Sequence, residues 1–79
     1  MNVPIVYTLP NCPRCDEIKE MFSAKGITYG VLDLEDDFVQ ADLLLDGITV
    51  TEAPVVYDQK DRKYRDYSQA REFYASYTA

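Results

Sequence analysis

Hydrophobic and polar positions change period along the chain, and the changes predict alternating strands and helices. Residues 3–9 form a short run rich in β-branched and aromatic residues, which is typical of a buried strand, and Pro10 ends it. A helix is expected to begin at Cys12 or Pro13, because proline is favoured at the first helical position. The helix should end at Lys25 and Gly26. Its apolar stripe has helical spacing and consists of Ile18, Met21 and Phe22.

The middle of the chain predicts a second strand and a second helix. Residues 27–32 have the composition of a strand. Asp36 or Asp37 is suited to cap a helix that Gly47 ends. The apolar positions expected to bury this helix include Phe38, Ala41, Leu44 and Leu45.

The last third of the chain predicts a hairpin followed by a third helix. Residues 54–58 and 62–65 are two strands joined by a polar turn, and they should pair antiparallel. Asp66 and Gln69 have the spacing of a capping box at a helix N-terminus. The buried stripe expected for that helix consists of Ala70, Phe73, Tyr74 and Tyr77.

Together these elements give the order β-α-β-α-β-β-α in a single domain, residues 1–79. Strand–helix–strand units favour parallel pairing with right-handed crossovers, and the hairpin adds an antiparallel edge. The sequence therefore predicts an α/β fold with a four-stranded mixed sheet flanked by three helices.

Composition excludes several classes of function. The 79 residues have a formal net charge of −6, which argues against nucleic acid as a partner, because phosphate binding needs clustered Lys and Arg. No apolar run approaches the roughly 18 residues of a membrane span, and the N-terminal stretch does not resemble a signal peptide. With only two cysteines, a reducing, cytoplasmic setting is expected rather than secretion.

Charge is distributed unevenly along the chain. Residues 33–46 contain six acids and no bases, whereas residues 60–71 contain five bases and two acids. The simplest interpretation is two solvated faces. The alternative is docking onto a partner of complementary charge.

The candidate chemistry is the stretch Cys12-Pro13-Arg14-Cys15, at the junction between the first strand and the first helix. Cys12 would be the helix cap, where unpaired N–H groups and the helix dipole stabilise a thiolate over a thiol. Arg14 adds positive charge nearby. Cys15 would lie deeper in the first turn. This predicts that Cys12 attacks a substrate disulfide and that Cys15 then resolves the mixed disulfide.

Two other interpretations of the cysteines remain open. Structural zinc commonly takes four Cys or His ligands, and the chain has two Cys and no His. A metal or an iron–sulfur cluster would therefore have to be shared between two chains. The cysteines could also be two small core residues, although a helix N-terminus is a poor place to bury thiols.

Nearly the whole chain resembles the thioredoxin superfamily, most closely its short glutaredoxin-like branch, in "VYTLPNCPRC", "ITYGVLDLE", "EAPVVYD" and the terminal helix. The resemblance implies a thioredoxin-like fold and a dithiol–disulfide oxidoreductase. It implies that Pro54 is cis and that Ala53 pairs with the substrate as an added strand. Pro13, Arg14 and Tyr67 would complete the substrate-binding surface.

The same resemblance implies a monomer with no bound cofactor, acting on disulfide-containing proteins or glutathione mixed disulfides. No metal is expected, because the chain has two Cys and no His as ligands. Electrons would come from glutathione or from a flavoprotein similar to thioredoxin reductase. An electron donor that does not use glutathione, for example to ribonucleotide reductase, is the alternative.

The chain departs from glutaredoxins where those proteins hold glutathione. Arg14 stands at a position that is usually aromatic, and Glu52-Ala53-Pro54 replaces Thr-Val-Pro. Residues 65–68 contain no glycine, whereas glutaredoxins carry a Gly-Gly pair before the last helix that lets backbone N–H groups approach the ligand.

Overall fold

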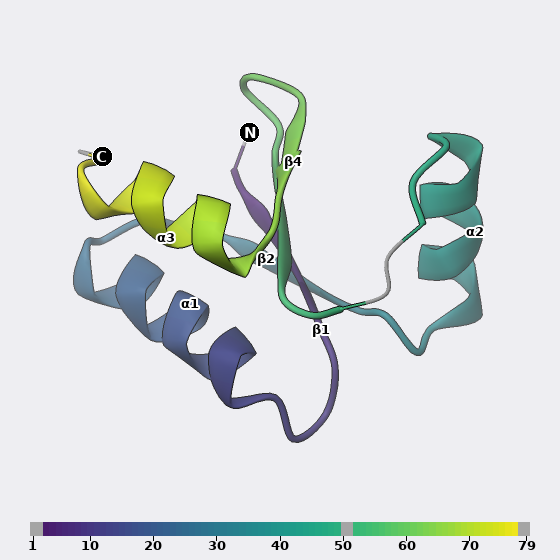
Figure 1. Cartoon of the computed structure of the whole chain (residues 1–79), viewed down its shortest axis with the longest axis horizontal. Helices are drawn as coiled ribbons and strands as arrows, with labels where there is room; N and C mark the ends of the chain where they lie inside the picture. The colour runs from purple at the N-terminus through teal and green to yellow at the C-terminus, as the bar shows by residue number, and fades with distance from the viewer. Residues whose placement is uncertain (1–2, 50–51, 78–79) are drawn as a thin grey trace.

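The order of elements predicted from the sequence is confirmed in the computed structural model, which describes residues 3–49 and 52–77 (Figure 1). The largest shift is in the second strand, which starts at Gly30 rather than Ile27. No helix within the described ranges is long and apolar enough to cross a membrane. The elements are β1 (Ile5–Thr8), α1 (Pro13–Ala24), β2 (Gly30–Asp33), α2 (Asp37–Leu45), β3 (Val55–Asp58), β4 (Lys63–Arg65) and α3 (Tyr67–Ala75).

The four strands form one mixed sheet in the order β2-β1-β3-β4. β1 and β2 pair in parallel, and β3 and β4 form the expected antiparallel hairpin. The parallel pairing expected for the second strand–helix–strand unit is wrong, because β3 runs antiparallel to β1. The chain leaves β2 and enters β3 at the same end of the sheet, so α2 does not carry it back to the other end.

The sheet separates two apolar clusters. In Figure 1, α1 and α3 lie side by side on one face, and α2 lies on the other. Val6 and Val56 face the first cluster, which also contains Ile18, Phe22, Ile27, Ala70 and Tyr74. The neighbouring residue Tyr7 points the other way, toward Leu34, Val39 and Leu43. This alternation is the ordinary period of two along a strand.

The helix ends follow the local signals in the sequence. After α1, Gly26 adopts a positive φ of 70°, and the N–H groups of Gly26 and Ile27 donate to the carbonyls of Ser23 and Phe22. This is a Schellman motif, in which glycine adopts the left-handed conformation without a Cβ penalty. α3 begins with the predicted capping box between Asp66 and Gln69.

The predicted buried face of α2 is wrong. Val39 and Leu43 face the sheet, whereas Phe38, Ala41, Leu44 and Leu45 are exposed. All of these positions are apolar, so periodicity alone does not select the face. The rotation of the helix about its axis agrees with two contacts in its N-terminal half. The Asp36 carboxylate caps the N-terminus, and the side-chain amide of Gln40 donates to the Leu34 carbonyl at 2.7 Å.

The predicted buried stripe of α3 is correct for Ala70 and Tyr74, which are buried. It is wrong for Phe73, whose side chain is 38% exposed. The Arg65 guanidinium lies over the Phe73 ring, 3.7 Å from its centroid. A cation–π contact therefore covers this ring in place of the core.

A buried hydrogen bond joins α3 to the sheet. The Tyr74 hydroxyl donates to the Asp58 carboxylate at 2.6 Å, and both residues are buried. The other Asp58 oxygen accepts from the Lys60 N–H at 2.9 Å. Burial, and next the hydrogen bond to Asp58, raise the pKa of Tyr74 above its ordinary value of 10.0. The two side chains are a satisfied polar pair within the core.

We predict that Tyr74→Phe lowers the free energy of unfolding by about 1–3 kcal/mol at neutral pH, because it leaves a buried carboxylate oxygen without its donor. Urea unfolding measures this change.

Above pH 10 the Tyr74 hydroxyl ionises in the unfolded chain but keeps its proton in the folded chain, so the wild-type protein loses stability. The difference between wild type and variant should therefore shrink as pH rises past 10. The control is Tyr29→Phe, since the Tyr29 ring packs on Phe22 and its hydroxyl has no hydrogen-bond partner in the part of the chain described. An equal loss in both variants would contradict the role given to the Asp58 pair.

Candidate active site

The two cysteines lie where the chain turns from β1 into α1. Asn11 has a positive φ of 56°, a conformation that asparagine tolerates better than most residues. The turn places Cys12 at the N-cap, with an extended φ of −113°, and Pro13 at the first helical position, as the sequence predicts. The backbone here leads directly from the central part of the sheet to the thiol pair.

Cys12 and Cys15 form a disulfide, with their Cα atoms 5.2 Å apart. The Cys15 backbone N–H donates to the Cys12 sulfur at 3.1 Å. Cys12 is partly exposed, whereas Cys15 is 1% exposed. The predicted difference in burial is therefore present. A helix N–H aimed at the Cys12 sulfur also favours its thiolate form when the disulfide is reduced.

Pro54 lies at the same end of the sheet as the cysteines. Tyr7 of β1 pairs with Val55 of β3 in antiparallel register. Pro54, which precedes Val55, therefore lies beside the end of β1, from which the chain continues to Cys12. Both segments are at the lower end of the sheet in Figure 1. The Ala53–Pro54 peptide bond is cis, as the family resemblance implies. Pro54 is buried and Ala53 is partly buried.

Arg14 and Tyr67, two of the residues predicted for the substrate surface, are in contact. The Arg14 guanidinium carbon lies 4.9 Å from the centroid of the Tyr67 ring. The Tyr67 hydroxyl donates to the Glu17 carboxylate and accepts from Arg71 Nη1 at 3.2 Å. A network between α1 and α3 thus holds a cation beside the cysteines.

Sequence reasoning missed Glu17 and Arg71 as members of this network. Arg71 follows Tyr67 by four residues, and this helical spacing was a signal for that contact. Nothing local indicated the contact between Glu17 and Tyr67, which are 50 residues apart.

A shallow groove lies between the segment that precedes β3 and the start of α3. It has a volume of about 320 Å³. Its lining includes two carboxylates, from Glu52 and Asp66, and one cation, from Arg65. Arg65 is paired with Asp61, with a nitrogen–oxygen distance of 2.5 Å, and this contact holds the pKa of the Asp61 carboxyl below its usual value. The lining residues are Ile48, Thr49, Glu52, Val55, Tyr64, Arg65 and Asp66.

Tyr7, which precedes the cysteine loop, belongs to the core. It is buried on the α2 side of the sheet. Burial is the largest cause that raises the pKa of its hydroxyl above the ordinary value. Its ring lies 6.4 Å from that of Tyr64, and the Tyr64 hydroxyl donates to Asp46 at 3.1 Å.

Residues 3–49 and 52–77 hold no group of three or more Cys, Asp or Glu side chains placed to bind a metal. The chain as a whole has no histidine. The donor set therefore does not fit a zinc site within one chain, which needs four ligands or three ligands and water.

The glutaredoxin family model matches residues 5–64, which include both cysteines and the cis-proline segment. The chain belongs to the glutaredoxin family. Among curated proteins, none matches it significantly.

Solved structures place this glutaredoxin-family chain among thioredoxin-like folds, as the sequence predicts. The crystal structure of the thioredoxin-like protein BC3987 is 26% identical, with a TM-score of 0.70, over 89% of this chain and 93% of that one. The glutaredoxin-like protein NrdH-redoxin from Escherichia coli has the same TM-score at 16% identity, over 96% of each chain. The second similarity shows the fold alone.

Proposed function

We propose that this glutaredoxin-family protein is a thiol–disulfide oxidoreductase that reduces disulfides of other proteins through Cys12 and Cys15. The observation that carries the proposal is a disulfide between one accessible and one buried cysteine, set at a helix N-terminus. A pair of this kind can accept two electrons and return them. A burial difference is what a division between an attacking and a resolving cysteine needs.

The proposed reaction has two exchange steps. The Cys12 thiolate attacks one sulfur of the substrate disulfide, that S–S bond breaks, and the departing substrate thiolate takes a proton from solvent. The Cys15 thiol then loses its proton to solvent and attacks the Cys12 sulfur. The S–S bond between Cys12 and the substrate breaks, and the second substrate thiolate leaves and takes a proton from solvent. The substrate gains two electrons, and the protein ends with the Cys12–Cys15 disulfide.

The backbone of Ala53 is the proposed site where the substrate pairs with the protein through main-chain hydrogen bonds. It precedes the buried cis-Pro54 at the end of the sheet that carries the cysteines. An extended substrate segment could pair there as an added strand, with main-chain hydrogen bonds supplying the affinity. Pro13, Arg14 and Tyr67 would border that segment, and Arg14 is already held over the Tyr67 ring.

The charges around the groove favour protein disulfides over glutathione. Glutathione has two carboxylates, whereas the groove presents the carboxylates of Glu52 and Asp66. Arg65 is engaged by Asp61. The capping box uses the Asp66 side chain at the N-terminus of α3. Arg14 is the remaining candidate for a carboxylate contact.

The regenerating electrons in this proposal come from a flavoprotein reductase rather than from glutathione. The solved structure of the E. coli NrdH-redoxin is described as that of a glutaredoxin-like protein with a thioredoxin-like activity profile. A dedicated electron donor of that type, for example to ribonucleotide reductase, is the specific form of this role that we consider. The protein would act as a cytoplasmic monomer without a bound cofactor.

We predict that Cys12→Ser abolishes reduction of a protein disulfide such as insulin, with dithiothreitol as the electron source. Cys15→Ser should accumulate a mixed disulfide on Cys12, because the resolving thiol is missing. Turbidity measures the reduction, and mass spectrometry without reductant identifies the adduct. Full activity in Cys12→Ser would contradict the mechanism. Metal-dependent pairing of chains through the four thiols would instead favour the shared-cluster interpretation.

We also predict that Glu52→Gln, made in the Cys15→Ser background, speeds formation of the glutathione adduct about two- to fivefold at low salt, since it removes a charge that opposes the glutathione carboxylates. Stopped reactions analysed by mass spectrometry give the rate. Glu20→Gln is the matched control, because Glu20 is an exposed acid of α1 that does not line the groove. The charge argument fails if both variants change the rate equally, or if the gain persists at high salt.

A further inference from the structure

The outward face of α2 exposes large apolar side chains that the protein itself does not cover. Phe38, Leu44 and Leu45 are 83%, 67% and 85% exposed. α2 has nine residues, and only Val39 and Leu43 are buried. Isolated exposed apolar residues are ordinary on a protein surface, whereas a set gathered on one helix indicates an interaction site.

These side chains have the spacing of a helix–helix contact. Phe38, Ala41 and Leu45 stand at i, i+3 and i+7, so they form one line along the helix, which we call the α2 stripe. The stripe faces away from Val39 and Leu43, which pack on the sheet. An apolar line with this spacing is the a/d pattern by which one helix packs along another.

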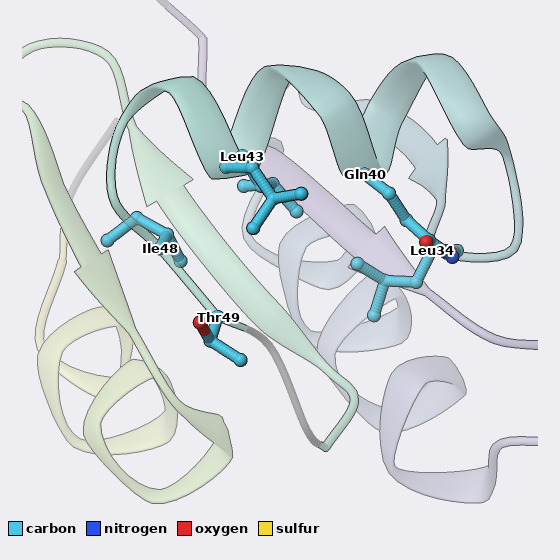
Figure 2. Close-up of a pocket in the computed structure, with 6 residues that line it drawn as sticks. Leu34, Gln40, Leu43, Ile48 and Thr49 are labelled. Carbon is cyan, nitrogen blue, oxygen red and sulfur yellow. The ribbon is translucent and has the colours of Figure 1, made fainter.

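A hollow lined by four apolar residues, with Gln40 and Thr49 at its edge, continues this surface on one side of the helix. Leu44 and Leu43 line it together with Leu34 and Ile48, and its volume is about 220 Å³. Figure 2 shows Leu34, Leu43 and Ile48 around the hollow, with Gln40 beside Leu34. This volume is below the roughly 300–1,000 Å³ of small-molecule pockets. The hollow therefore suits an anchoring side chain from a partner.

Acidic side chains border the stripe. Asp37 precedes Phe38, and Asp42 follows Ala41, so they occupy the positions that flank an a/d line. Residues 33–46 contain no lysine or arginine. The salt bridges within the described ranges involve Asp16 and Asp61, which lie elsewhere. The border of the stripe is thus negative and is not neutralised by bases of the described chain.

This charge pattern selects the occupant. An anionic membrane or a nucleic acid would be repelled. A second copy packed through the same stripe would place Asp37 and Asp42 against like charges. We propose that the α2 stripe binds an α-helix of a partner protein whose own apolar line is flanked by lysine or arginine.

The position of the stripe keeps the cysteines accessible while a partner is bound. α2 lies on the face of the sheet opposite α1 and α3 (Figure 1). A helix docked on α2 could hold a partner to this protein while Cys12 exchanges disulfides. The docking proposal does not depend on the proposed redox function, and each can fail separately.

A pair of designed helical peptides tests the proposal. One has leucine at positions a and d and lysine at e and g, and the matched peptide has glutamate in place of lysine. We expect the lysine peptide to cause saturable ¹H–¹⁵N shifts confined to residues 35–48 of the full chain. Raising sodium chloride from about 0.05 M to about 0.5 M should weaken this binding. The glutamate peptide should cause no shifts.

Variants assign the binding to the stripe. Phe38→Ser combined with Leu45→Ser should raise the dissociation constant of the lysine peptide by about tenfold or more. The control, Val31→Thr, changes a residue of β2 that is 49% exposed and should leave the dissociation constant unchanged. Asp37→Lys with Asp42→Lys should reverse the preference between the peptides. All variants should stay folded and keep the wild-type insulin-reduction rate.

Three results would overturn the proposal. The first is no binding of the lysine peptide, or shifts that map outside α2. The second is equal binding of both peptides. The third is sedimentation that shows a dimer dispersed by the Phe38 and Leu45 changes, because the occupant would then be a second copy.

Discussion

The candidate active site of this protein depends on the pairing of β1 with β3. β1 is the strand that leads into Cys12, and β3 is the strand that cis-Pro54 precedes. Their antiparallel register places Tyr7 opposite Val55, so both segments meet at one end of the sheet. A shift of one residue would turn every side chain of a strand to the other face. Such a shift would expose Val6 and Val56, which are buried on the face of the sheet that α1 and α3 cover.

The two sheet faces hold different elements. On one face, α1 carries the cysteines at its N-terminus and packs against α3, and Tyr67 joins the two helices through Arg14 and Glu17. On the other face, α2 is fixed by few residues and keeps much of its apolar surface outside. The proposed chemistry and the proposed docking surface therefore lie on opposite sides of one sheet.

Local signals in the sequence predicted most of the fold. Proline at the first helical position, the Asp66–Gln69 capping box and the glycine after α1 each fix a helix end through neighbouring residues, and all are present. The cysteine pair was found for the same reason, since its position at a helix N-terminus follows from short-range spacing. The cis state of Pro54 came from the family resemblance, because X-Pro bonds are mostly trans.

The predictions from the sequence were wrong or incomplete where the structure depends on contacts between residues far apart in the chain. α2 has apolar residues on both its inner and its outer side, so its buried face depends on where the sheet meets it, and periodicity selected the wrong side. The direction of β3 depends on pairing with a strand some 50 residues earlier. The contact between Tyr67 and Glu17 also joins residues far apart in sequence.

Redox equilibration tests the central claim most directly. The protein is incubated across ratios of reduced to oxidised glutathione, quenched with acid and weighed by mass spectrometry. We predict a fully reversible Cys12–Cys15 disulfide whose midpoint lies within the roughly −270 to −200 mV of thioredoxins and glutaredoxins. A protein that forms no internal disulfide at any ratio would contradict the account.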